Sequence, residues 1–314
     1  GLNVHRYSTD NLQWDENLDR NWNYVLPDFF AKYDFKKSQS LTLDYKMTAN
    51  FTDVNQVASG VILQSYNSLF SGNTYLDNAI YHNVTMRFFS FNLFNFTNIF
   101  AFVNYNKKIS EITNAVNYVG INRVNSPINA TAANDAVTGS IGYQRRIKVY
   151  KVSLRGTWNY SLINNLIDNQ NNANTSLTQN YTIRFGTNFK KAPNIDVGYK
   201  VALNNYEGTN VSTSYTNHQP FIEFEWYFLN GFLLNVEYNY NNYKASTGPS
   251  SVYDFLDARL SYQKKDSKWE YYLSGTNLLN TEFIRTDSFS NSVTSTQQVF
   301  VLPRYVTVGF KYDL

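Results

Sequence analysis

The sequence has 314 residues and a mass of 36.4 kDa, and its 27 Lys and Arg residues against 24 Asp and Glu residues give a net charge of +3. Disordered chains carry few aromatic residues and a high net charge, so an aromatic content of 17% excludes disorder. The small net charge, with no Lys/Arg run longer than two residues, argues against nucleic acid as a main partner. The absence of Cys excludes disulfides and thiolate metal sites.

Apolar stretches are short throughout the chain. One of the longest, Ile99–Val103, has five residues, whereas a membrane-spanning helix needs about 20. The sequence therefore excludes helical membrane insertion. The chain begins at Gly1 without a basic segment followed by an apolar one, so we expect a mature or excised part of a longer protein.

Apolar residues instead recur at every second position, which is the pattern of β-strands with one buried or lipid-facing side. The first clear pair of strands, Phe29–Phe35 and Leu41–Phe51, is joined by the polar link Lys36–Gln39. The pattern then predicts strands over Val84–Phe91, Ile99–Tyr105, Val137–Tyr143, Lys151–Tyr160, Tyr181–Phe189, Ile195–Asn204, Ile222–Phe228, Phe232–Asn241, Leu256–Tyr262, Trp269–Ser274 and Val306–Leu314, and Gly1–Tyr7 is interpreted as the remnant of another. We expect about fourteen strands and no helix.

The links between these strands alternate in length. The short ones are Lys36–Gln39, Asn92–Asn98, Gln144–Ile147, Lys190–Asn194, Leu229–Gly231 and Gln263–Lys268, and the long polar ones are Ser8–Asn23, Thr52–Tyr81, Asn106–Asp135, Ser161–Gln179, Asn205–Gln219, Asn242–Tyr253 and Asn277–Gln298. Short turns at one end and long loops at the other are typical of an antiparallel up-and-down transmembrane β-barrel. The alternative is a soluble β-sandwich, whose strands run about five or six residues.

The two faces of the predicted strands differ in polarity. We expect Val201, Val236 and Val308 to face lipid, and their neighbours Asn235 and Thr307 to face a wet lumen. Aromatic residues near strand ends match the girdles of membrane barrels: Tyr24, Tyr160, Trp226, Tyr240, Tyr262 and Trp269. The predicted lumen-facing charges are Arg184, Lys200, Glu223, Glu225, Glu237, Asp257 and Arg259.

We interpret Glu223 and Glu225 as solvated interior charges, although two carboxylates two residues apart on one face would also suit a cation or sugar contact. Asp257 and Arg259 share a face, and we expect them to pair with neighbouring strands. The three His residues lie far apart, and phosphate-loop, nucleophile-elbow and zinc-protease motifs are absent from the sequence. We expect no catalytic residues, no metal, no cofactor and no enzymatic activity.

The last fifty residues carry a resemblance to a known family. The run Tyr272–Asn280, with Asn277, Leu278, Leu279 and Asn280 at its turn, is similar to the penultimate strand of TonB-dependent outer-membrane receptors. Pro303–Leu314 resembles their closing strand, with an alternating assembly signal at Phe310, Tyr312 and Leu314. Upstream, Leu26–Tyr33 resembles a segment of the outer-membrane β-barrel subfamily of these receptors.

The resemblance implies a single domain over residues 1–314 that forms the C-terminal portion of a larger 22-stranded barrel, with the plug domain and TonB box outside this chain. It implies integration in the bacterial outer membrane by the barrel assembly machinery, contact with outer-membrane lipid, and coupling to TonB through the plug. The implied function is active uptake of a scarce nutrient, a metal chelate or a glycan, as an unidentified small-molecule ligand. The terminal Leu314 departs from the usual Phe.

Two other functions fit the same pattern. A plugless, porin-like channel would transport passively, with selection by pore size and lining charge. A free-standing barrel of fourteen strands is compatible with that reading, because an even strand number can close. A non-transport scaffold or surface protein that docks other outer-membrane partners is the third.

Overall fold

The computed structural model describes residues 2–11, 16–58, 60–209, 211–246, 250–289 and 294–313. As the sequence predicts, the fold is all-β and mostly antiparallel, with 17 strands in one large sheet assembly. Two further two-stranded sheets are separate from it: β1 (Leu2–Asn11) with β2 (Glu16–Val25), and β19 (Phe283–Phe289) with β20 (Thr294–Phe300). No helix among the described residues is long and apolar enough to cross a membrane.

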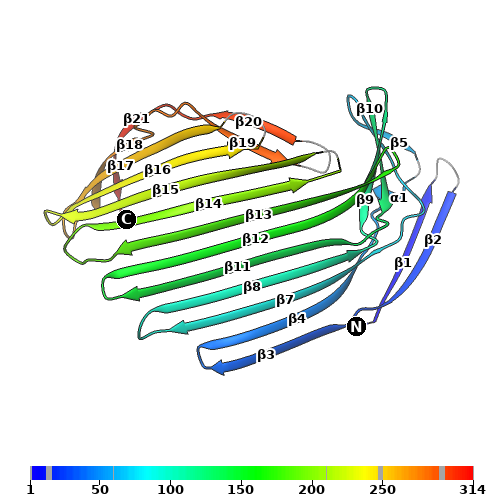
Figure 1. Ribbon diagram of the computed structural model, residues 1–314, viewed down its shortest axis with the longest axis horizontal. Helices are drawn as coiled ribbons and strands as arrows, with labels where there is room; N and C mark the ends of the chain where they lie inside the picture. Colours follow the sequence, from blue (N-terminus) through cyan, green and yellow to red (C-terminus); the bar gives the residue numbers. More distant parts are fainter. Residues whose placement is uncertain are drawn as a thin grey trace.

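Thirteen strands of the large sheet form a continuous antiparallel series that we call the wall (Figure 1). In order across the wall they are β3 (Asp28–Lys36), β4 (Gln39–Asn50), β7 (Ala79–Asn92), β8 (Thr97–Ile109), β11 (Asn134–Ile147), β12 (Tyr150–Ile167), β13 (Gln170–Thr187), β14 (Asn194–Glu207), β15 (Ser212–Phe228), β16 (Phe232–Ala245), β17 (Ser251–Gln263), β18 (Trp269–Thr276) and β21 (Tyr305–Tyr312).

The described residues form a curved wall and not a closed barrel. β3 has a registered partner only in β4, and β21 only in β18, and Figure 1 shows these two strands at opposite margins of the sheet. The segment Gly1–Tyr7 is expected as a remnant wall strand, but its described part, Leu2–Tyr7, belongs to the separate β1–β2 hairpin. No register joins Val306–Phe310 to it, as we expect of an incomplete wall.

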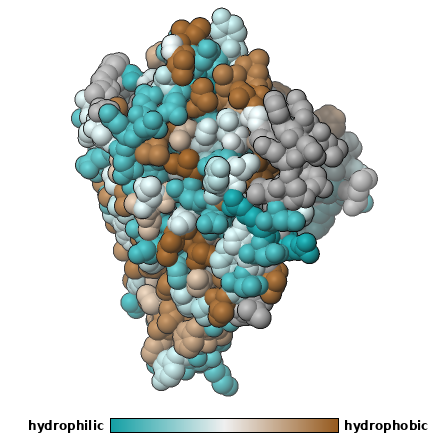
Figure 2. Space-filling view, turned by 90° about the vertical axis from the view of Figure 1, so that its right-hand side faces the viewer, coloured by the Kyte–Doolittle hydropathy of each residue, from teal (hydrophilic) through white to brown (hydrophobic). Residues whose placement is uncertain are grey.

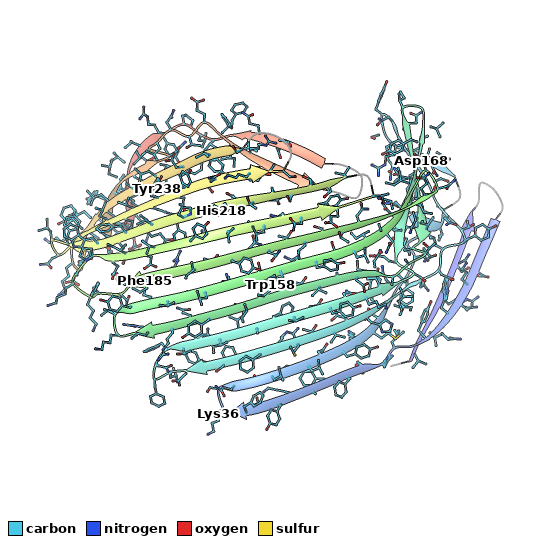
Figure 3. All side chains as sticks on the ribbon, viewed as in Figure 1. Lys36, Trp158, Asp168, Phe185, His218 and Tyr238 are labelled. Carbon is cyan, nitrogen blue, oxygen red and sulfur yellow. The ribbon has the colours of Figure 1, made fainter. Side chains whose placement is uncertain are left out.

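The turns at one end of the wall are short and the connections at the other are long (Figure 1). Two labelled residues in Figure 3 identify these ends: Lys36 closes β3 at the short-turn end, and Asp168 lies at the tip of the β12–β13 hairpin at the other. We call the latter the hairpin end. One predicted turn is misplaced: Gln144–Ile147 is strand, and the turn follows at Lys148, which has a φ of 57°.

The expected count of about fourteen strands is too low, because the long polar links are built largely of hairpins. Both β12 and β13 have 18 residues and meet at Asp168 and Asn169, whose positive φ values of 48° and 60° suit a tight hairpin turn. Four short strands form a side sheet at this end: β5 (Val61–Ser65), β6 (Ser68–Ser71), β10 (Asn122–Asn129) and β9 (Ile112–Val119). The side sheet joins β12 through Leu166 and Ile167.

The expectation of no helix is also wrong, by one turn. α1 (Val54–Val57) lies in the link after β4. Its N-cap Asp53 accepts a hydrogen bond from the backbone N–H of Asn55, and Gln56 accepts one from the backbone N–H of Asp53. These reciprocal bonds form a capping box, a signal that the sequence Asp53–Gln56 carries but that apolar alternation does not reveal.

Several of the buried side chains at the hairpin end are amides of Asn residues. Asn164 and Asn134 are buried, and the Asn164 backbone N–H donates to Asn134 Oδ1 over 2.7 Å. Asn172 donates to Asn165 Oδ1 over 3.0 Å across the β12–β13 pair. Because buried polar groups are stable only when hydrogen-bonded, these amides hold the hairpins in one arrangement. Figure 2 shows hydrophilic and hydrophobic residues interspersed over this end.

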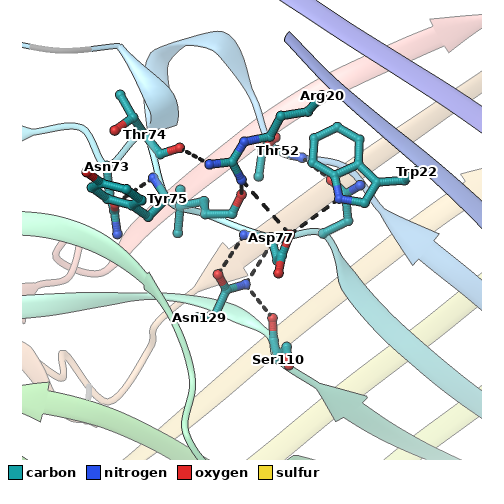
Figure 4. A network of polar contacts seen from close by, with 11 residues as sticks. Arg20, Trp22, Thr52, Asn73, Thr74, Tyr75, Asp77, Ser110 and Asn129 are labelled. Carbon is teal, nitrogen blue, oxygen red and sulfur yellow. Dashed lines mark hydrogen bonds and ion pairs between the residues drawn. The ribbon is translucent and has the colours of Figure 1, made fainter. Parts of the chain in front are cut away.

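The β1–β2 hairpin is fastened to the rest of the chain by a polar network (Figure 4). Arg20 donates to the carbonyl oxygens of Leu76 and Thr74, and Trp22 Nε1 donates to Asp77 Oδ1 over 3.3 Å. Asn129 in turn exchanges two hydrogen bonds with the Asp77 backbone, of 2.8 and 2.7 Å. The link before β7 is thereby tied both to the N-terminal hairpin and to the end of β10.

Candidate functional site

The wall has two chemically different faces, which follow from the cross-strand register. Residues opposite each other in a sheet lie on the same face, so one row can be followed from strand to strand. One such row is Tyr33, Leu41, Phe88, Ala101, Ile141, Gly156, Tyr181 and Val201, and another is Trp226, Leu234, Leu260, Leu273 and Val308. We call this the apolar face; Val201, Val236 and Val308 all lie on it.

Charged residues on the apolar face are confined to strand ends. On the thirteen wall strands they are Lys107, Asp135, Arg145, Glu207, Lys244 and Asp254, each within three residues of its strand's end. The central apolar side chains are nevertheless accessible: Ile183 is 52% exposed and Leu273 47%. The wall therefore presents an exposed apolar band with charges only at its margins.

The opposite, polar face carries all seven of the charges singled out in the sequence. The register places Arg184 on β13, Lys200 on β14, Glu223 and Glu225 on β15, Glu237 on β16, and Asp257 and Arg259 on β17, on one face. Their common face agrees with the alternation from which they were selected.

Four carboxylates form a row across four adjacent strands. Asp196 is opposite Glu223, Glu223 is opposite Glu237, and Glu237 is opposite Asp257. Like charges directly across a strand pair are destabilising. Arg184 offsets part of this repulsion: its Nη2 lies 2.6 Å from Glu223 Oε1 and its Nη1 lies 3.5 Å from Asp196 Oδ2.

The other two carboxylates of the row are held by uncharged donors. Asn239 Nδ2 donates to Glu237 Oε1 over 2.8 Å, and the Asn277 backbone N–H donates to Asp257 Oδ1 over 2.7 Å. A groove of about 420 Å³ runs along this row and is lined also by Glu225 and Arg259; we call it the acidic groove. Among the described residues, no cluster of three or more His, Cys, Asp or Glu could hold a metal ion.

Aromatic rings on the polar face lie over glycines of the neighbouring strand, and cations stack on the rings. Phe221 is opposite Gly198, where an added Cβ would lie 2.2 Å from the ring. The Arg184 guanidinium carbon and Lys200 Nζ lie 4.9 and 4.7 Å from the Phe221 centroid. Cation–π attraction at such distances favours one orientation of each cation, so the ring positions both.

The same arrangement recurs twice on this face. Phe100 is opposite Gly142, and the Arg155 guanidinium carbon lies 5.8 Å from its ring centroid. Tyr272 is opposite Gly309, with the guanidinium carbon of Arg259 at 4.1 Å. Arg259 Nη2 also lies 3.2 Å from Glu270 Oε1 on the next strand. This ion pair is the cross-strand pairing expected of Arg259.

A second groove, of about 540 Å³, lies beside the acidic one and is lined by Lys151, Arg155, Arg184 and Lys200, with Asp196 as its acidic member. We call it the basic groove. Lys151, Arg155 and Asp196 were not among the predicted site residues, although all three sit at polar positions of predicted strands. The signal that could have found them is an aromatic residue breaking the alternation on the polar face, as Phe100 and Phe221 do.

The turn motif Asn277–Asn280 has a structural role that its position alone did not reveal. Asn277 is 2% exposed, and its side-chain amide donates to the carbonyl oxygens of Thr281 and Leu302 over 2.8 and 2.9 Å and accepts from the Thr281 backbone N–H over 2.9 Å. Asn280 Oδ1 accepts from the Arg304 backbone N–H over 3.1 Å. The motif therefore joins the end of β18 to the segment that enters β21.

The expected assembly signal is described only in part. Phe310 and Tyr312 lie on the apolar face of β21 beside Trp269, with ring centroids 5.5 and 4.8 Å from its own. Leu314 lies outside the described residues.

No protein-family model, curated protein or solved structure matches this chain.

Proposed function

We propose that the wall is part of an outer-membrane β-barrel that takes up a scarce small-molecule nutrient. The observation that carries this proposal is the apolar band, from whose centre charges are excluded over thirteen strands while the opposite face is polar and charged. An exposed apolar surface of this extent marks a membrane or protein contact. A lipid-facing band with a polar interior is the pattern of transmembrane barrels.

The band has the dimensions that a bilayer requires. On β16 the segment Phe232–Tyr240 is nine residues long and has an apolar side chain at every second position, and a tilted membrane strand needs about 9–11 residues. At the short-turn end, aromatic rings contact one another along the band: the centroids of Phe228 and Phe232 are 5.6 Å apart, and those of Phe232 and Tyr262 are 4.6 Å apart. Such a belt suits the interface between hydrocarbon and head groups.

The family resemblance of the last fifty residues supports three further parts of the proposal. They are coupling to TonB, a plug domain outside this chain, and a ligand that is a metal chelate or a glycan. The test is growth of a deletion strain on defined iron and glycan sources. We expect a specific growth defect on one source that is restored by the wild-type gene. Normal growth on every scarce source, with increased resistance to small hydrophilic antibiotics, would favour the passive channel instead.

The orientation of the wall is a separate prediction. Because the short turns gather at one end, we expect them to face the periplasm and the hairpin end to face outside. Single Cys substitutions at Ser38, in the turn between β3 and β4, and at Asn114 and Asn169, at the hairpin end, should report this in intact cells. A membrane-impermeant maleimide should label Asn114→Cys and Asn169→Cys but label Ser38→Cys only after lysis.

Labelling of Ser38→Cys alone in intact cells would invert the orientation. Asn210, another residue of the long links, lies outside the described residues and serves as an independent position. Because the chain has no native Cys, each variant carries a single reactive thiol.

A further inference from the structure

We propose that the basic groove is a binding site for a compact, multiply charged anion whose charge is carried by carboxylate or phosphate groups. The groove lies on the polar face across β12, β13 and β14, with Phe100 of β8 beneath one side. The proposal rests on the proposed function, because in a barrel the polar face lines the interior, where it is open to water and solutes. Its experiment measures binding and not uptake, so the two can fail separately.

The first argument is an excess of positive charge. Of the four cations that line the groove, Arg184 is paired with Asp196 and Glu223. Within the described part of the chain, Lys151, Arg155 and Lys200 have no carboxylate oxygen within 4.0 Å, and Asp196 is the one acidic residue of the lining. Three like charges within one groove repel each other unless a counter-charge is present. A bound anion would supply it.

The second argument is that the cations are held in place before any ligand arrives. Arg155 stacks on Phe100, and Lys200 and Arg184 stack on Phe221, which is 2% exposed. A side chain that is already oriented loses less conformational entropy when it binds. Arg155 and Lys200 are nevertheless exposed, so their charged groups remain available to a ligand.

The third argument is that two glycines let side chains of the groove pack directly against the sheet. Gly142 and Gly186 both line the groove, and an added Cβ would lie 1.9 Å from the Phe100 ring at Gly142 and 2.1 Å from Asp196 Oδ1 at Gly186. Side chains at these two positions would fill the space that the ring and the carboxylate now occupy. The glycines therefore make room for the ring on which Arg155 stacks and for the carboxylate that pairs with Arg184.

Charge separation across the polar face argues for an anion at this groove specifically. The acidic groove overlaps the basic one at Lys151 and Asp196 and continues across β15 to β17, where it is lined by Glu223, Glu225, Glu237 and Asp257. An anion on that side would be repelled by these four carboxylates. The end of the shared surface that carries Arg155 and Lys200 is therefore the more favourable one for an anion.

The test uses the purified chain in detergent micelles and isothermal titration calorimetry, with inorganic pyrophosphate as the phosphate probe and citrate as the carboxylate probe. We expect saturable binding of at least one probe, and the tighter-binding probe shows whether the groove prefers phosphate or carboxylate groups. Arg155→Gln and Lys200→Gln should each weaken it at least tenfold, and Lys200→Arg, which keeps the charge, should retain most of it.

Arg87→Gln is the matched control. Arg87 lies on the same face of β7, is exposed, and has its guanidinium carbon 5.8 Å from the Phe102 ring centroid, but it does not line the basic groove. Its substitution should leave the affinity unchanged. An equal loss of affinity in Arg87→Gln and Arg155→Gln would show non-specific charge attraction and would overturn the proposal. Absence of saturable binding to the wild-type chain would also overturn it, provided that the circular-dichroism spectrum shows the chain to be folded.

Discussion

Replacing Asn277 with alanine is expected to lower the free energy of unfolding by about 4 kcal/mol. The change removes three hydrogen bonds of a buried amide, to the Thr281 carbonyl, the Thr281 N–H and the Leu302 carbonyl. Each is worth about 1 kcal/mol, and the partners left unsatisfied add to the loss. Asn277 also has a φ of 50°, a conformation that costs alanine about 1–2 kcal/mol.

Two further variants separate these causes. Asn277→Gly tolerates the positive φ and should recover about 1 kcal/mol relative to Asn277→Ala, while still lacking the amide. Asn280→Ala is the matched control, because Asn280 has a similar φ of 60° but makes one side-chain hydrogen bond within the described part of the chain, from the Arg304 N–H. Urea unfolding in lipid vesicles, followed by tryptophan fluorescence, measures each loss. Equal losses of unfolding free energy at positions 277 and 280 would show that the three hydrogen bonds of the Asn277 amide do not add to stability as expected.

Arginine in place of Val236 is expected to destabilise the vesicle-bound chain by about 2–4 kcal/mol, because on the proposed function the guanidinium would lie in hydrocarbon near mid-depth. Val236 is opposite Phe224 and Ala258 on the apolar face. The adjacent Asn235→Arg should cost far less, since Asn235 lies on the polar face beside Glu225. Val201→Arg and Val308→Arg should follow Val236→Arg, and Thr307→Arg should follow Asn235→Arg.

The same comparison distinguishes a membrane wall from a water-soluble sheet. In a sheet whose apolar face is covered by protein, the cost of Val236→Arg would persist without lipid. On the proposed function it depends on the bilayer, so it should be larger in vesicles than in detergent micelles. Equal costs for Val236→Arg and Asn235→Arg in vesicles would contradict the assignment of lipid to this face.

Period-two alternation was sufficient to predict the wall from the sequence. The strands over Phe232–Asn241 and Leu256–Tyr262 lie within β16 and β17, and the turn at Leu229–Gly231 separates β15 from β16 as predicted. A strand that is apolar on one side only leaves this clear signal. The register then places the seven predicted charges on a common face without further information.

The hairpin end could not be predicted in the same way. The outer half of β12 carries polar side chains on both faces, as the successive residues Asn164 and Asn165 show, so no alternation distinguishes it from a loop. The basic groove was missed for another reason: Lys151, Asp196 and Phe100 come from strands far apart in the sequence. Only the register of β8 through β14 brings their side chains to one surface.

Because the β12–β13 hairpin is long, the backbone conformation of its tip does not depend on which exposed side chains it carries. At about 3.3 Å per residue, 18 residues span nearly 60 Å, about twice the thickness of a bilayer core. The outer half is held by main-chain hydrogen bonds that every residue except proline can make. Away from the buried amides, the exposed tip residues Asp168, Asn169, Gln170 and Asn171 can therefore be substituted without altering the backbone pairing. On the proposed function, the chain could in this way vary its outermost surface while keeping a fixed form.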